Sequence, residues 1–252
     1  MKLSSKDKRD ILIIGDACVD VFVYCSCKRL CPEGPVPVLE IVEVKKNYGM
    51  AGNVLKNIEA LGSKAVLVCN ANFKKVTKTR YVEKESNHLF IRIDESPPVK
   101  KLTDIKEISL SQYSCVIVSD YEKGFLSTED LVYISENHPL TFIDTKKILG
   151  DWAKSFSFIK INEKEFEASR KHLTDNVKSK IITTLGSKGC VYNGKEYEAE
   201  KVEVKDVSGA GDTFLSSFVI EYLRTRSEDE AIRFANKCSA SVVSRRGVVT
   251  IK

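Results

Sequence analysis

Residues 206–214, DVSGAGDTF, place three small residues directly ahead of an acid. The run FLSSFVIEYLRT from position 214 has apolar residues at helical spacing, so we expect a helix to begin at this point. A helix entrance gathers free backbone N–H groups and the positive end of the dipole, and residues without bulk let an anion approach them. Asp212 at this entrance is either a helix cap or a base, and the local pattern leaves both open.

Other acids, amides and glycines follow short apolar runs along the chain. Ligands of open parallel sheets bind beyond the carboxyl ends of the strands, so these residues are site candidates. They are Asp16 and Asp20, Asp120 with Lys123 in SDYEKG, Asp144 with Lys146 in DTKK, Asn162 with Glu165 in NEKE, and Thr184 to Gly189 in TLGSKG. Each one alone is better explained by a turn or a helix cap, but together they favour a site. The chain has no G-x-x-x-x-G-K-[ST] loop and no G-x-G-x-x-G after its first strand, which leaves GAGD as the candidate for binding nucleotide phosphate.

After residue 100, apolar runs alternate with helical patterns. CVIVSD, LTFID, FIKIN and IITTLG are short enough to be buried strands, and STEDLVYISENH and EKEFEAS are typical of helices. A last helix is expected to start at Ser227, with Glu230 completing a capping box. This alternation predicts an α/β fold with a mostly parallel sheet covered by helices on both faces.

The first hundred residues have a different pattern. ILIIGDACVDVFVY predicts one strong strand, VPVLEIVEV another, and GMAGNVLKNIEALG a helix that ends at Gly62. TRYVEK and HLFIRID form a predicted hairpin. Strands within about residues 21–44 and 79–94 alternate polar with apolar residues, as in a sheet wet on one side, and predict a small lid projecting over the site.

Composition narrows the class of protein. The 252 residues, 42% hydrophobic and 30% charged, suit a single domain spanning residues 1–252. The net charge of +5 is spread along the chain, which argues against a nucleic-acid surface and is explained by an anionic substrate. Without a membrane-length apolar run or a signal-peptide core in MKLSSKDKRD, we expect a cytoplasmic protein with no membrane partner. The eight cysteines lack zinc-site spacing and are expected to be reduced thiols.

Several motifs together resemble one family. DVSGAGD fits D-[TV]-[ST]-G-A-G-D, the C-terminal signature of the ribokinase-like (PfkB) sugar kinases, and the resemblance covers nearly the whole chain. CPEGPVPVLEI, KTRYVEK, LFIRID, SDYEKG and RFANKCSASVVSRRG further resemble the D-glycero-D-manno-heptose-7-phosphate kinases of ADP-heptose synthesis. The resemblance implies a ribokinase-like fold and a kinase that uses ATP and Mg²⁺. Its implied acceptor is a sugar phosphate, most closely the anomeric hydroxyl of that heptose phosphate.

The resemblance also implies a role for each matching residue. Asp212 would take the proton of the acceptor hydroxyl, and the N–H groups of Gly209, Ala210 and Gly211 would bind the charge on the transferred phosphoryl group. The implied ligands of Mg²⁺, through water, are Asn162 and Glu165. The implied nucleotide-binding residues are Lys146, Asn162, Glu165, Thr184, Gly186, Gly189, Ser208 and Asn236. The implied sugar-binding residues are Asp16, Asn53, Arg92, Asp120 and Lys123, with Arg92 or Lys123 pairing with the sugar phosphate.

The chain departs from the family pattern in two segments. GMAGN replaces G-G-A-A-N, so the Met50 side chain is expected to intrude on the sugar. Residues 71–77 stand where the family has a helix and a further strand, which predicts an exposed face on the first strands unless a second subunit covers it. A homodimer through the lid strands is the expected assembly, and ADP-heptose synthesis would need a separate nucleotidyltransferase. Two alternatives stay open: a kinase of another sugar or a nucleoside, and a non-catalytic ligand-binding relative.

Overall fold

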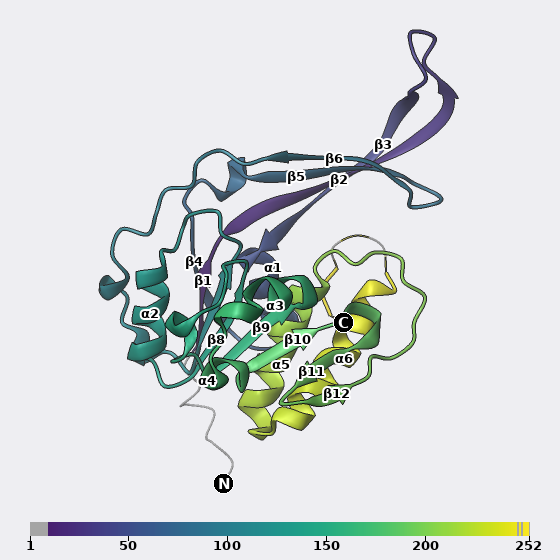
Figure 1. Ribbon diagram of the computed structural model, residues 1–252. Helices are drawn as coiled ribbons and strands as arrows, with labels where there is room; N and C mark the ends of the chain where they lie inside the picture. The colour runs from purple at the N-terminus through teal and green to yellow at the C-terminus, as the bar shows by residue number, and fades with distance from the viewer. Residues whose placement is uncertain (1–9, 246, 248, 252) are drawn as a thin grey trace.

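An eight-stranded sheet forms the centre of the molecule (Figure 1). The computed structural model describes residues 10–245, 247 and 249–251. The strand order is β12-β11-β10-β9-β8-β7-β1-β4, parallel from β4 to β10 and antiparallel at β10–β11 and β11–β12. The strands are β1 (Ile11–Gly15), β4 (Ala65–Cys69), β7 (Val116–Asp120), β8 (Thr141–Thr145), β9 (Phe158–Asn162), β10 (Ile181–Thr184), β11 (Cys190–Tyr192) and β12 (Lys195–Tyr197). The predicted mostly parallel sheet is therefore confirmed.

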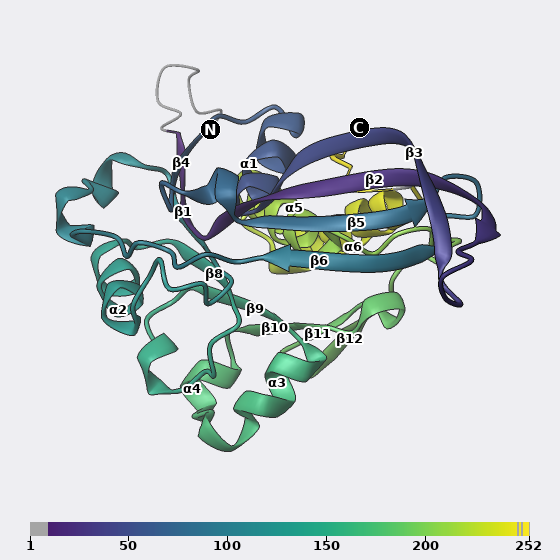
Figure 2. The same cartoon turned by 90° about the horizontal axis from the view of Figure 1, so that it is seen from above.

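Helices cover both faces of this sheet, as Figure 2 shows from above. One face carries α1 (Ala51–Ala60), α5 (Ala210–Thr225) and α6 (Glu228–Val243), and the other carries α2 (Thr128–Asn137), α3 (Glu163–Ser169) and α4 (Asp175–Lys178). Successive residues of β1 alternate between the two cores, as the period of two requires: Ile13 packs on the α5 side and Leu12 on the α2 side. At the start of α6 the Ser227 hydroxyl accepts from the Glu230 N–H, but the Ser227 N–H donates to Thr225, so only half of the predicted capping box forms.

A second sheet of four strands projects from the core and forms the lid (Figure 1). Its order is β3-β2-β5-β6, with β2 (Ala17–Leu30), β3 (Pro37–Met50), β5 (Thr77–Glu83) and β6 (Leu89–Glu95). The predicted hairpin is the antiparallel pair β5–β6. The lid strands run above α5 and α6 (Figures 1 and 2). The small sheet expected from the alternating pattern is present, and its strands extend beyond the predicted bounds.

The first predicted strand is wrong in one respect: it is two strands that belong to different sheets. β1 ends at Gly15 in the main sheet, and β2 begins at Ala17 in the lid. Gly15 passes so close to β7 that a Cβ on it would lie 1.9 Å from the Ser119 carbonyl oxygen, and the Asp16 N–H donates to the same oxygen at 3.1 Å. The chain changes sheet immediately after this contact, which leaves Asp16 at the junction of core and lid.

The shortened segment leaves β1 covered but part of the edge strand β4 exposed: no residue of β4 is fully buried, and Val66 is 38% exposed. The expected exposed face is therefore absent at β1 and present at β4. A single 3₁₀ turn, Phe73–Lys75, is the only helical element between β4 and β5 in the described chain. Leu12 and Ile14 of β1 are nevertheless fully buried. Ile105 and Leu110, from the connection before β7, pack in the same core and cover that face. A second subunit is therefore not needed to bury these residues.

Two further features concern the chain as a whole. No helix in the described ranges combines the length and the apolar character that crossing a bilayer requires. The cysteines are unpaired thiols, and Cys18, Cys115 and Cys190 are buried, where they pack as small hydrophobic side chains.

Candidate active site

Asp212 lies in the first turn of α5, with its side chain only 4% exposed. The helix starts at Gly209, whose φ of 81° lies in the left-handed region that glycine adopts readily. The Asp212 Oδ2 accepts from the Asn53 side-chain amide at 2.9 Å, and its Oδ1 accepts from the Tyr121 hydroxyl at 2.7 Å. The carboxylate thus binds α1 and the loop after β7, while the N-cap residue of its own helix is Gly209. This geometry favours a base over a cap.

Burial sets the charge behaviour of Asp212. Loss of solvent raises the pKa of its carboxyl to about 6, while the hydrogen bonds from Asn53 and Tyr121 act in the opposite direction. Nearby Asp144 raises this pKa further, and Lys160 lowers it. The carboxylate is therefore still ionised at neutral pH, and its pKa is close enough to neutral for it to accept a proton efficiently.

The turn ahead of Asp212 offers fewer donors than the sequence suggests. The Thr213 N–H donates to the Gly209 carbonyl at 2.9 Å, and the Ala210 N–H donates to the Val207 carbonyl at 3.3 Å. Helix geometry leaves the N–H groups of Gly211 and Asp212 without a partner inside the helix. The Ala210 N–H, assigned by resemblance to the phosphoryl group, is thus engaged within the loop.

A buried ion pair lies beside this turn. The Lys160 ammonium of β9 contacts the Asp144 Oδ2 at 2.7 Å, with both side chains at most 6% exposed. A Cβ on Gly211 would lie 2.7 Å from the Lys160 Nζ, so the glycine makes room for the ammonium. The Asp144 Oδ1 is buried and has no partner among the described residues. Sequence reasoning missed Lys160; its signal is a lone lysine within the apolar strand FIKIN.

A cavity of about 310 Å³ opens at the same turn. Four residues that the resemblance assigns to the nucleotide line this cavity: Thr184, Gly186, Gly189 and Asn236. Ala210 and Gly211, from the turn ahead of Asp212, line it too. Gly189 is required by space, because a Cβ there would lie 1.9 Å from the Tyr197 carbonyl oxygen. The Asn236 amide donates to that same carbonyl at 3.0 Å, which fixes the last strand against α6. Predicted residues far apart in sequence therefore converge on one cavity.

Lys146, Asn162 and Glu165 gather at the ends of β8 and β9 instead. Asn162 and Glu165 form a capping box at the start of α3, with the Glu165 N–H donating to Asn162 Oδ1 at 3.0 Å and the Asn162 N–H donating to Glu165 Oε2 at 2.8 Å. The Lys146 ammonium contacts Glu165 Oε1. Burial lowers the pKa of the Lys146 ammonium, but the nearby carboxylates of Asp144 and Glu165 have the larger combined effect, so this pKa is raised. Ser208 lies in the turn before α5, where its N–H donates to Asp206 at 2.8 Å.

These residues suit Mg²⁺ only when water supplies most of its ligands. Across residues 10–245, 247 and 249–251, no three His, Cys, Asp or Glu side chains are grouped so that they could hold a metal ion. One carboxylate and one amide at the start of α3 can bind metal-coordinated water, and Mg²⁺ keeps much of its hydration in such sites. The arrangement fits an ion carried by a triphosphate.

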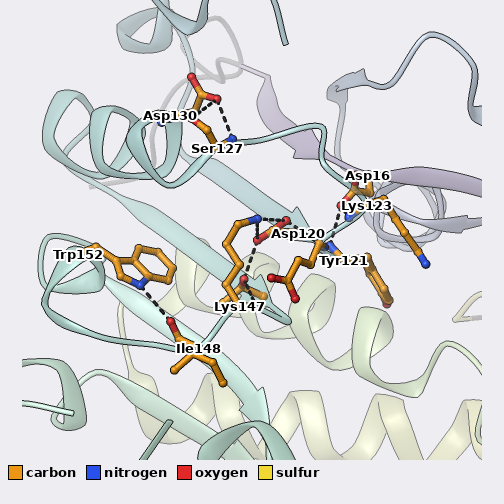
Figure 3. Close-up of polar contacts among 11 residues, drawn as sticks. Asp16, Asp120, Tyr121, Lys123, Ser127, Asp130, Lys147, Ile148 and Trp152 are labelled. Carbon is orange, nitrogen blue, oxygen red and sulfur yellow. Dashed lines mark hydrogen bonds and ion pairs between the residues drawn. The ribbon is translucent and has the colours of Figure 1, made fainter. Parts of the chain in front are cut away.

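Two of the acids assigned to the sugar have different surroundings, as Figure 3 shows. The Asp16 Oδ2 accepts from the N–H groups of Tyr121 and Lys123 at 2.9 and 3.1 Å, and its buried Oδ1 has no partner among the described residues. Burial raises the pKa of the Asp16 carboxyl. Asp120 turns away from this point, toward the Lys147 ammonium at 2.8 Å, and both of its oxygens are bonded within the protein. The Lys123 side chain extends away from the Asp120–Lys147 pair.

Arg92 is an exposed residue of the edge strand β6. Its guanidinium forms two hydrogen bonds with Asp94, at 2.8 and 3.1 Å. Arg80, in the K-x-R segment of β5, is largely buried, and its guanidinium binds the Asp20 carboxylate at 2.6 Å inside the lid. Neither arginine lines the open cleft described next.

A cleft of about 820 Å³ lies at the base of the lid. Asn53, which binds Asp212, is part of its wall. Its basic lining residues are Lys46, Lys56, Lys74 and Arg245, and none of the described residues that line it is acidic. This positive cleft was not found from the sequence, because its lysines come from separate segments and match no motif.

Met50 does not intrude on this cleft, contrary to expectation. Its backbone has a φ of 57°, which is unusual for a residue with a side chain. The side chain is 3% exposed and packs against Cys18 and Val76. The neighbouring Gly49 is the position that admits no side chain, because a Cβ there would lie 2.2 Å from an oxygen of Asp20.

Sequence comparisons agree with this geometry. Residues 128–252 match the pfkB family carbohydrate kinases. The chain carries a pfkB family kinase domain. It is 29% identical over 297 aligned positions to the bifunctional protein HldE of Helicobacter pylori, covering 95% of this chain and 64% of that protein. It is 27% identical to the bifunctional protein HldE of Nitratiruptor, covering 96% of this chain and 63% of that protein. The chain thus spans less than two thirds of the length of these curated relatives.

Solved structures show that the chain has a ribokinase-like fold. Ribokinase from Thermotoga maritima matches with a TM-score of 0.69 at 17% identity, covering 95% of this chain and 94% of that one. Phosphofructokinase-2 from Escherichia coli matches with a TM-score of 0.71 at 15% identity, covering 97% and 95%. Arabidopsis thaliana ribokinase, solved with ribose and ATP, matches with a TM-score of 0.65 at 14% identity, covering 95% and 94%.

Proposed function

We propose that the protein is an ATP-dependent sugar kinase whose acceptor is a sugar phosphate. The most specific candidate is the anomeric hydroxyl of D-glycero-D-manno-heptose 7-phosphate. One observation carries the proposal: Asp212 lies between the linings of the two cavities, because it binds Asn53 of the basic cleft and follows Gly211 of the 310 Å³ cavity. A base placed between an acceptor site and a donor site is what phosphoryl transfer requires.

The transfer follows from this arrangement. The acceptor O–H bond breaks and its proton passes to the Asp212 carboxylate, while the acceptor oxygen bonds to the γ-phosphorus and the bond to the ADP oxygen breaks. The N–H groups of Gly211 and Asp212 and the nearby Lys160 ammonium stabilise the negative charge on the phosphoryl oxygens. Mg²⁺ neutralises the triphosphate when bound, and Asn162 and Glu165 would hold its water ligands.

The basic cleft supports a phosphorylated acceptor. Lys46, Lys74 and Arg245 come from three separate segments and give the cleft a positive charge that a neutral sugar does not need. Arg92 is already paired with Asp94, so we assign the sugar phosphate to the cleft residues instead. The heptose acceptor also rests on the similarity to the HldE proteins.

A substrate panel tests this proposal. Purified protein would be incubated with ATP, Mg²⁺ and, in turn, the heptose 7-phosphate, other sugar phosphates, free sugars and nucleosides, with ADP release measured and products followed by phosphorus NMR. We expect the highest kcat/KM with the heptose phosphate and a new anomeric phosphate signal. Higher activity on a free sugar or a nucleoside would overturn the acceptor, and ATP binding by calorimetry without ADP release on any acceptor would point to a non-catalytic relative.

We also propose that two copies of the chain form a dimer through their lids. The strand register places Ile41, Val44, Ile91 and Ile93 on the lid face opposite Asp20 and Arg80, and all four are about half exposed. The same face carries Val21 and Lys46 of the basic cleft, so the proposed dimer contact adjoins that cleft. Half-exposed apolar side chains grouped on one sheet face favour association. A nucleotidyltransferase would act next on the product in ADP-heptose synthesis, in keeping with the bifunctional names of the relatives.

A further inference from the structure

We propose that Tyr121 is a positioning residue that holds the Asp212 carboxylate in place for proton transfer, an inference that rests on the proposed kinase function. Tyr121 follows β7 directly, and its hydroxyl donates to the Asp212 Oδ1 at 2.7 Å. The two residues are 91 positions apart, so the contact exists only in the folded protein. Nothing in the motif around Tyr121 assigns it this part.

The two oxygens of Asp212 are held by different donors. Asn53 donates to Oδ2 from α1, and Tyr121 donates to Oδ1 from the loop after β7. Both donors are neutral; burial and the nearby Asp212 charge raise the pKa of the Tyr121 phenol well above its ordinary value, so it keeps its proton. Each carboxylate oxygen can accept a second hydrogen bond. The carboxylate is therefore fixed in orientation and still able to accept the proton of a substrate hydroxyl.

Tyr121 is itself fixed from several sides. Its N–H donates to Asp16 at the junction of core and lid. The Lys78 ammonium of lid strand β5 lies 5.2 Å from the centre of its ring, and the Lys146 ammonium lies 5.4 Å from it. Lys146 in turn contacts Glu165, beside the triphosphate site proposed above. The position of the hydroxyl on Asp212 is thus set by the lid, the core and the nucleotide side together.

A purely structural role for Tyr121 predicts a different result on titration. The titratable and charged groups that face Asp212 are Tyr121, Asp144, Lys146, Lys160 and Cys18. The hydrogen bond from the Tyr121 hydroxyl stabilises the ionised carboxylate, so removing that hydroxyl raises the pKa of Asp212. The base acts only when ionised, so the acid side of the pH–rate profile moves to higher pH. Loss of packing alone would lower the rate at every pH without moving the profile.

The first test compares Tyr121→Phe with Tyr192→Phe. Tyr192 is a buried tyrosine of β11 in the aromatic core, so its variant controls for the loss of a buried phenol elsewhere. We expect Tyr121→Phe to lower kcat about 10-fold or more at pH 7, to leave the Kd for ATP nearly unchanged, and to shift the acid limb of kcat/KM up by about one pH unit. Tyr192→Phe should keep the wild-type profile.

A second test does not depend on activity. Carbon-13 NMR of labelled aspartate carboxyls, with the Asp212 signal assigned by its loss in Asp212→Asn, gives the titration midpoint of Asp212 directly. The midpoint should rise in Tyr121→Phe and fall when a fluorinated, more acidic tyrosine is placed at position 121. An unchanged midpoint in both proteins overturns the proposal. Absence of kinase activity in the wild type would overturn the proposed function instead, while this titration would still report on Tyr121.

Discussion

At the residue scale, the proposed reaction depends on an acid whose surroundings make it a usable base. An exposed aspartate is ionised across the whole physiological range and holds protons weakly. Asp212 is buried next to Asp144, with two neutral donors and Lys160 limiting the rise in its pKa. The same environment that raises this pKa to about 6 places the carboxylate beside the start of α5.

The pH dependence of the reaction follows from this pKa. Because the base must be deprotonated, kcat/KM should be constant above the pKa of about 6 and should fall about tenfold per pH unit below it. The measurement is initial ADP release between pH 4.5 and 8, with recovery of activity at pH 7.5 as the control for acid unfolding. An acid limb near pH 4 would mean that Asp212 is not buried as described.

Gly211 tests the close approach of Lys160. In Gly211→Ala the new Cβ displaces the Lys160 ammonium from its place beside Asp144, so we expect kcat to fall about 10-fold or more. Gly34→Ala is the matched control, because a Cβ there meets nothing within 4 Å and should leave kcat unchanged. Equal kcat in the two variants would show that Lys160 does not support the reaction.

At the element scale, the lid holds together partly through a buried ion pair. Arg80 of β5 binds Asp20 of β2, with the two side chains 12% and 9% exposed. Arg80→Ala leaves this carboxylate buried without a partner and should lower the free energy of unfolding by about 3 kcal/mol. Arg92→Ala breaks a pair whose arginine is half exposed and should cost no more than about 1 kcal/mol. Urea unfolding of the two variants makes the comparison, and equal losses would contradict it.

The order of strands and helices was predictable because it follows from local pattern. Short apolar runs and helix-start signals placed most elements of the core, and strand ends pointed to Thr184, Gly186 and Gly189, which line one cavity. The change of sheet at Asp16 was not predictable, because it depends on the close approach of Gly15 to Ser119.

Side-chain partners were less predictable, because they depend on distances between segments far apart in the chain. Motif matching pointed to Arg92 and Asp120, which are bonded elsewhere within the protein, and passed over Tyr121 and Lys160, which lie at the centre of the site. The residues around Tyr121 carry no local signal that identifies a partner 91 positions away.

At the scale of the whole molecule, the exposed apolar face of the lid predicts association. Ile93→Lys places a charge on this face and should convert a dimer into a monomer in sedimentation velocity. Ile148→Lys changes an isoleucine of similar exposure on the core and should leave the dimer intact. A wild-type protein that sediments as a monomer at tens of micromolar would contradict the proposed dimer.

The role of Asp212 as the base is tested most directly by the turnover of Asp212→Asn. The amide keeps the shape of the side chain but cannot take a proton from the acceptor. With ATP, Mg²⁺ and the best acceptor of the panel, we expect kcat to fall by about 10²- to 10⁴-fold while calorimetry shows ATP binding within a few-fold of wild type. Turnover within a few-fold of wild type would show that this carboxylate is not the base.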